Sequence, residues 1–203
     1  MTKKEPPKPA WRLYAHPAFS KPFDALVAEV ARLRKNDPSG YAQHPKAKLL
    51  KRIVDLVETE IPRDPGAAEY NLGNTLGPAH RHWRRAKFLG RFRLFFRYDS
   101  KAAVILYAWV NDENTLRKTG GANDPYRLFS GMLRKGRLPN DWAALLNKRW
   151  LISRPSPKNA ARTTGAIRLN AAVGCGGEPA GGRMADLLLH FGNDLAGMSR
   201  SRR

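Results

Sequence analysis

The sequence predicts a small α+β domain, because two amphipathic helical patterns precede three strand-like runs and one further helix. In the helical patterns, between residues 20 and 36 and between 45 and 61, apolar residues recur at spacings of three and four. The strand-like runs, at about 83–89, 91–98 and 103–110, are rich in aromatic and β-branched residues. We therefore expect a small antiparallel sheet with two N-terminal helices and one C-terminal helix packed on one of its faces.

The ends of the two N-terminal helices follow from local residue types. Ser20 is a candidate N-cap of the first helix, and Asn36-Asp37-Pro38 is expected to end it. Pro45 suits the first turn of the second helix, where its missing N–H costs nothing. The second helix is expected to end at Ile61-Pro62. Together the two segments predict a helical hairpin.

Shorter signals complete the expected order of elements. Residues 11–15 alternate weakly between apolar and polar types, which predicts a short edge strand. Gly90 and Asp99-Ser100 are the expected turns between the three main strands. Asp124-Pro125 is typical of a helix start, and the last helix is expected to close near Gly136.

The charge balance points to a polyanionic partner. The 203 residues carry 37 Lys and Arg against 17 Asp and Glu, a formal net charge of +20. A surface this basic argues against an enzyme of small neutral metabolites and favours a protein that binds nucleic acid. The single cysteine, Cys175, excludes an internal disulfide and a cysteine-based zinc site. We expect no metal ion and no cofactor.

Composition divides the chain into three parts. Residues 1–10 are expected to be a flexible N-terminus, 11–146 the folded domain, and 147–203 a basic, Gly- and Ala-rich tail that is largely disordered. The N-terminus has cations but no apolar stretch behind them, so it does not resemble a secretory signal. No run approaches the ~18 apolar residues of a membrane span. The expectation is a cytoplasmic protein without membrane contact.

The strongest functional signal lies between residues 81 and 97. Every charged residue there is basic, and aromatic residues are interleaved with the cations. Because side chains alternate between the faces of a strand, Arg85 and Lys87 should project together, as should Arg91 and Arg93 on the next strand. Facing like charges repel, a cost that a bound polyanion would offset. The alternative is the solvated outer face of a half-buried sheet.

Other side chains near this segment have more than one interpretation. The expected RNA contacts are Arg81, His82, Arg84, Arg91 and Arg97. His80 and His82 could supply the acid and base of metal-independent RNA cleavage, contact phosphate, or simply be exposed. Trp109 and Trp142 fit core packing better than base stacking, while Trp83 fits either role.

Longer motifs then resemble a known family. They are Tyr70–Gly77, His82–Phe88, Arg91–Tyr98 and Ala108–Arg117. Over about 11–146 the chain resembles the YhaV-type toxins of type II toxin–antitoxin systems. The resemblance implies the fold of the RelE superfamily and a ribosome-associated endoribonuclease that inhibits translation. It also implies a PrlF-type antitoxin and a complex that binds operator DNA.

The resemblance further implies the catalytic residues and their chemistry. They would be Arg85, Lys87, Arg93, Arg117 and Tyr126. The 2′-hydroxyl of RNA would attack the adjacent phosphorus and leave a 2′,3′-cyclic phosphate. Arginines would stabilise the phosphorane, Lys87 would accept the proton, and Tyr126 would either orient a base or pack inward.

Two functions of different classes remain open from the sequence. The first is a ribonuclease toxin neutralised by an antitoxin. The second is a non-catalytic protein that docks on RNA or the ribosome by charge alone. Cleavage of RNA by the purified protein would separate them.

Overall fold

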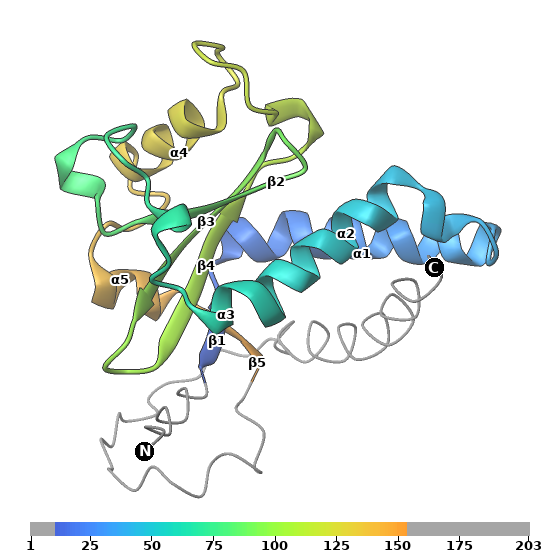
Figure 1. Cartoon of the computed structure of the whole chain (residues 1–203), viewed down its shortest axis with the longest axis horizontal. Coiled ribbons are helices and arrows are strands. Elements are labelled where there is room, and N and C mark those ends of the chain that lie inside the picture. Colours follow the sequence, from blue (N-terminus) through green and yellow to red (C-terminus); the bar gives the residue numbers. More distant parts are fainter. Residues whose placement is uncertain (1–10, 154–203) are drawn as a thin grey trace, which may run out of the picture.

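The computed structural model describes residues 11–153, so the expectations for 1–10 and 154–203 lie outside the described residues. A five-stranded sheet, in the order β2-β3-β4-β1-β5, forms the centre (Figure 1). Its strands are β1 Arg12–Ala15, β2 Arg84–Phe88, β3 Phe92–Asp99, β4 Val104–Val110 and β5 Trp150–Ser153. The three main strands confirm the prediction to within one residue at each end. The mixed α+β class is also confirmed.

The sheet is mostly antiparallel but contains one parallel pair. β2, β3 and β4 form successive antiparallel hairpins, whereas β1 runs parallel to β4 and antiparallel to β5. The prediction that residues 11–15 form an edge strand is therefore wrong, since β5 covers that edge. β5 also extends the folded domain past the expected boundary at residue 146. Ile152, which is 2% exposed, joins the core from this strand.

The two long helices start with the same dipeptide, His-Pro. α1 covers Pro17–Asn36 and α2 covers Pro45–Asp55. The Nδ1 atoms of His16 and His44 accept the N–H of the residue two positions on, at 3.1 and 3.2 Å. Imidazole thus performs the capping role usually given to Ser or Asp. Ser20 is inside α1, and its predicted role as N-cap is wrong.

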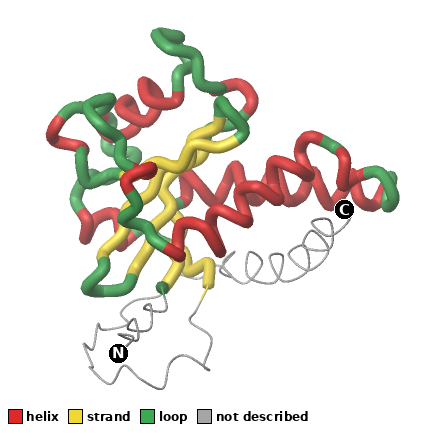
Figure 2. Tube along the Cα trace, viewed as in Figure 1, coloured by secondary structure: helices red, strands yellow, loops and turns green. Residues whose placement is uncertain are grey.

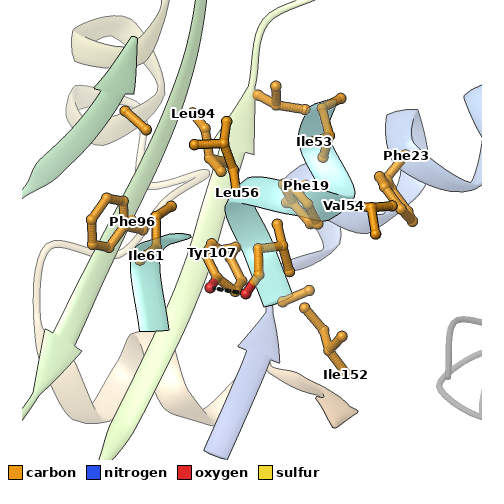
Figure 3. Close-up of a cluster of buried hydrophobic side chains, with 14 of the residues drawn as sticks. Phe19, Phe23, Ile53, Val54, Leu56, Ile61, Leu94, Phe96, Tyr107 and Ile152 are labelled. Carbon is orange, nitrogen blue, oxygen red and sulfur yellow. Dashed lines mark hydrogen bonds between the residues drawn. The ribbon is translucent and has the colours of Figure 1, made fainter. Parts of the chain in front are cut away.

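Helical structure continues slightly beyond the end expected at Ile61-Pro62, by way of a π-helical turn. α2 continues as a π turn over Leu56–Glu60 and then as α3 over Ile61–Arg63. Ile61 donates its N–H to the carbonyl of Leu56. The next donor in this pattern would be Pro62, which has no N–H, so the Val57 carbonyl lacks a helical partner. The Tyr107 hydroxyl donates to that carbonyl at 2.6 Å (Figure 3).

Helices cover both faces of the sheet, not one face as predicted (Figure 2). On one face, Phe19 of α1 and Ile53 of α2 belong to the same core as Phe96 of β3 (Figure 3). α4 (Pro125–Arg134) and α5 (Trp142–Asn147) pack on the other. The adjacent residues Phe95 and Phe96 are both fully buried because they point to opposite covered faces.

Four short 3₁₀ turns complete the described elements: Tyr41–Gln43, Ala68–Tyr70, Pro78–His80 and Glu113–Thr115. Between residues 11 and 153, no helix has the length and apolarity needed to cross a membrane.

Candidate active site on the β2–β3 hairpin

The hairpin register places three predicted catalytic residues on one face. Lys87 pairs directly with Arg93, and Arg85 pairs with Phe95. Paired residues share a face in an antiparallel ladder, so Arg85, Lys87 and Arg93 project to the side that α4 covers at Phe95. The predicted sharing of a face is thus confirmed.

The three side chains differ in what they contact. Lys87 is exposed, whereas Arg93 is only 7% exposed. Nη1 of Arg93 donates to the carbonyls of Gly90 and Phe92, at 3.0 and 2.6 Å, while its Nε is buried without a partner. Arg93 therefore braces the hairpin turn, and Lys87 is the accessible cation of the pair.

The Arg85 side chain reaches the segment that lies beside β2, the edge strand of the sheet. Its Nη1 donates to the carbonyl of Glu69 at 3.2 Å, in the loop beside β2, and its Nε is buried without a partner. Arg84, a predicted RNA contact, lies on the opposite face, with its guanidinium 5.8 Å from the ring centre of Tyr98. Arg84 and Arg85 therefore do not form one surface.

The turn itself is tight and partly strained. Leu89 and Gly90 have φ of 42° and 70°, a region in which a leucine is unusual. Leu89 is also the one large apolar side chain between residues 11 and 153 that is mostly exposed. The structure thus presents an apolar tip next to Lys87 and Arg91.

Arg117 and Tyr126 are held together by the start of α4. Asp124, 5% exposed, caps the helix by accepting the N–H of Tyr126 at 3.0 Å, and its second oxygen accepts from Nη1 of Arg117. The guanidinium of Arg117 lies 4.9 Å from the ring centre of Tyr126. Tyr126 packs inward, with its ring edge-on to Phe95 at 5.7 Å.

The loop after β4 fastens Arg117 to the hairpin turn. Arg117 donates its N–H to the carbonyl of Arg91 at 3.0 Å, and Nε of Arg91 donates to the carbonyl of Arg117 at 3.1 Å. Asn111 accepts the N–H of Arg93 and donates to the carbonyl of Thr115 at 2.8 Å. Figure 1 shows this loop beside the turn that joins β2 and β3.

These bonds create what we call the turn cluster: Lys87, Arg91, Arg93, Arg117 and Tyr126. Sequence reasoning missed the two residues that hold it together. Asn111 lies within the Ala108–Arg117 motif but was assigned no role, and Asp124 was recognised only as a helix cap. Lys87 is exposed at the end of the hairpin where Arg91, Arg93 and Arg117 are fixed, and cationic side chains of this kind can bind a phosphate group and stabilise charge that develops on it.

A second group of polar residues surrounds Asn140, near the opposite end of the hairpin. The Asn140 side-chain oxygen lies 2.9 Å from Nε2 of His82, 3.3 Å from Nδ1 of His80 and 3.0 Å from Nε1 of Trp83. Arg97 donates to the Asn140 carbonyl at 2.7 Å. Asn140 gave no sequence signal. We call this group the Asn140 cluster.

Partial desolvation and neighbouring charges set the electrostatics of the Asn140 cluster. Desolvation, then the charge of Arg97, lowers the pKa of His82 from its ordinary value. Desolvation also lowers the pKa of Arg97, against an opposing effect of Asp141. His82 is therefore mostly neutral at neutral pH.

The remaining candidates are less involved in these clusters. Arg81 is exposed and donates to the side-chain oxygen of Asn74 at 3.3 Å. Trp83 is fully buried, and half-buried Trp109 stacks on Phe95, as core packing requires. Within residues 11–153, no three His, Cys, Asp or Glu side chains are grouped so that they could hold a metal ion.

Comparison with known proteins identifies the family. Residues 13–149 match the family model Toxin_YhaV, described as a toxin with endonuclease activity, of a toxin–antitoxin system. The chain belongs to this family. Toxin YhaV of Escherichia coli O6:H1 and ribonuclease toxin YhaV of Escherichia coli K12 are each 45% identical to it over 137 residues. The match covers 66% of this chain and 89% of each relative. No solved structure matches.

The match confirms the family that the sequence motifs indicated. It covers both clusters, since His80, Lys87, Arg117 and Asn140 all fall within residues 13–149. It also includes α5, at the end of the predicted domain. As a Toxin_YhaV member, the chain is a toxin with endonuclease activity, which disfavours the alternative of a non-catalytic binding protein.

Proposed function

We propose that this toxin is a metal-independent endoribonuclease whose reaction occurs at the turn cluster. The observation that carries the proposal is the cross-strand pair of exposed Lys87 and buried Arg93, with Arg117 brought to the same end of the hairpin. The name of the K12 relative, ribonuclease toxin YhaV, supports RNA as the substrate.

The proposed reaction needs no group beyond the chain and RNA. The 2′-oxygen of one ribose bonds to the adjacent phosphorus while the bond from phosphorus to the 5′-oxygen breaks. The products are a 2′,3′-cyclic phosphate and a 5′-hydroxyl. The proton of the 2′-hydroxyl is removed by a base, and the leaving oxygen gains one from an acid or water.

Side-chain positions suggest how the roles divide. Lys87 is exposed, so it can reach a bound phosphate and is the candidate base for the 2′-proton. Arg117 is held in place by the Tyr126 ring and Asp124, and we assign to it the stabilisation of negative charge on a phosphorane. A guanidinium hardly deprotonates, which disfavours Arg117 as proton donor. Arg85 and Arg93 add positive potential while holding backbone carbonyls.

The partners remain part of the proposal. We propose that the fold is that of the RelE superfamily and that the toxin acts on ribosome-associated mRNA in the cytoplasm, which inhibits translation. A PrlF-type antitoxin would neutralise it, and the complex would bind operator DNA. The family description, a toxin of a toxin–antitoxin system, supports an antitoxin partner.

The test is cleavage by purified full-length protein in EDTA. We expect Lys87→Ala to lower the cleavage rate by roughly 10²- to 10⁴-fold, the usual contribution of one general base. The matched control is Lys35→Ala, which removes an exposed lysine from the last turn of α1, far from the hairpin. End-group analysis of the products should find cyclic phosphates. Equal cleavage by the two variants would reject the assignment of Lys87.

A further inference from the structure

The hydrogen bonds of the Asn140 cluster determine how the Asn140 amide is oriented and which imidazole nitrogens carry a proton. An indole nitrogen can only donate, so the Asn140 atom that Trp83 contacts at 3.0 Å must be the amide oxygen. The two imidazoles that meet the same oxygen must then donate as well. His82 therefore carries a proton on Nε2, and His80 carries one on Nδ1.

The other nitrogen of each ring is consequently a free acceptor. Nδ1 of His82 and Nε2 of His80 have no hydrogen-bond partner among residues 11–153. The two ring centres are 6.4 Å apart. If each free nitrogen gains a proton, the rings become two cationic donors beside one another, a suitable pair for the oxygens of one phosphate.

Arg97 adds a fixed guanidinium to the same cluster. Its carbon lies 5.4 Å from the ring centre of Trp83 and 5.0 Å from that of Trp142, and its Nη1 donates to the Asn140 carbonyl. Its other N–H groups have no hydrogen-bond partner among the described residues. Asp141 is the acid that acts on Arg97, and its carboxylate caps α5 through Ala144 at 2.8 Å.

The cluster is separate from the turn cluster. His82 precedes β2 and Lys87 is near its end, so at about 3.3 Å per residue the two lie roughly 15 Å apart. No single phosphate can contact both. A single RNA strand running along the hairpin could, with a few nucleotides between the two contacts.

We propose that His80, His82 and Arg97, gathered on Asn140, bind a phosphodiester of single-stranded RNA away from the bond that is cleaved. The proposal rests on the proposed function only in taking RNA as the ligand. Single-stranded RNA is favoured over a protein partner because a stacked guanidinium and two imidazoles suit a phosphate beside an unpaired base. The cluster would hold the strand while the turn cluster reacts.

Binding at this cluster should strengthen as the pH falls. A bound phosphate stabilises imidazolium, whereas the groups that face His82 in the free protein, His80 and Arg97, disfavour it. The negative charge of Asp141 acts on Arg97 and partly offsets the positive charge there. RNA binding is thus coupled to proton uptake, and affinity should rise about tenfold for each unit by which binding raises the histidine pKa.

The experiment measures affinity without cleavage. A short single-stranded RNA with 2′-O-methyl riboses lacks the attacking hydroxyl, and its binding to the full chain is followed by fluorescence anisotropy at about pH 5.5 and about pH 8 at fixed ionic strength. The wild-type protein should bind roughly tenfold tighter at the lower pH. His82→Gln should lose most of that difference, and Arg97→Gln should weaken binding at both pH values.

Lys35→Gln is the matched control, since it removes one positive charge from α1 and should keep the wild-type pH difference. Thermal melts establish that each variant is folded, and exposed His82 is the safer of the two positions. An unchanged pH difference in His82→Gln would overturn the proposal. Unchanged RNA affinity of His82→Gln, combined with weakened binding of the antitoxin, would also overturn it. Cleavage by Lys87→Ala is measured separately, so failure of either proposal is recognised independently.

Discussion

At the scale of single residues, Tyr107 shows how one hydroxyl completes a helix that proline interrupts. Its oxygen donates to the Val57 carbonyl in a fully buried environment, and burial strongly raises the pKa of the phenol. The hydroxyl is therefore a fixed neutral donor. Without it, the Val57 carbonyl would be buried with no partner from Pro62.

We therefore expect Tyr107→Phe to lower the free energy of unfolding by about 1–3 kcal/mol, the cost of a buried polar group left unpaired. Tyr98→Phe is the control, because the Tyr98 hydroxyl has no hydrogen-bond partner among residues 11–153. Urea denaturation measures both. If the two substitutions cost the same, the bond to Val57 does not stabilise the π turn.

His16 makes stability depend on pH. Burial, with a smaller effect of the Lys148 charge, lowers the pKa of His16 to about 4. The unfolded chain has an ordinary histidine pKa of about 6.5, so the folded state binds fewer protons. His16 therefore stabilises the fold above that value, and its contribution is lost as the pH falls from 6.5 towards 4.

The loss should amount to about 3 kcal/mol over that window. His16→Asn keeps a capping side chain but cannot titrate there, so the variant should lose less stability than the wild type between neutral and acidic pH. Denaturant midpoints of both proteins at several pH values supply the comparison. Parallel curves would show that His16 does not titrate with the fold.

At the scale of elements, the sequence was sufficient where a pattern is local. The strands around Gly90 and Asp99-Ser100 and the sharing of a face by Lys87 and Arg93 follow from periodicity and turn residues. β5 could not be predicted, because a short run before a Gly- and Ala-rich stretch becomes a strand only by pairing with β1.

The candidate site divides in the same way. Most of its cations could be listed from the basic hairpin, and Arg117 from the family resemblance, but their supports could not, because Asn111, Asp124 and Asn140 are brought to the site by the tertiary fold. Asn140 lies 57 positions from Trp83 in the chain. No periodicity connects residues so far apart, so only the structure reveals which cations are fixed and which, like Lys87, remain accessible.

At the scale of the whole molecule, the two ends of the described chain meet in the sheet. β1 is held between β4 and β5, so the last strand completes the pairing of the first (Figure 1). Ile152 fills the core beneath α1, and the guanidinium of Arg149 lies 4.9 Å from the ring centre of Tyr14. Residues 147–153 therefore belong to the fold itself.

This arrangement predicts different results for two truncations. A chain that ends at Leu146 lacks β5, so the edge of β1 is exposed and Ile152 is missing from the core. The burial of Ile152 alone is worth about 2–5 kcal/mol. A chain that ends at Ser153 keeps β5 and Ile152. We expect the first to melt well below the second and to lose activity with its fold. Thermal unfolding and RNA cleavage by the two purified proteins test this. Equal melting temperatures would mean that β1 and the core tolerate an open edge, and that β5 is dispensable for the turn cluster.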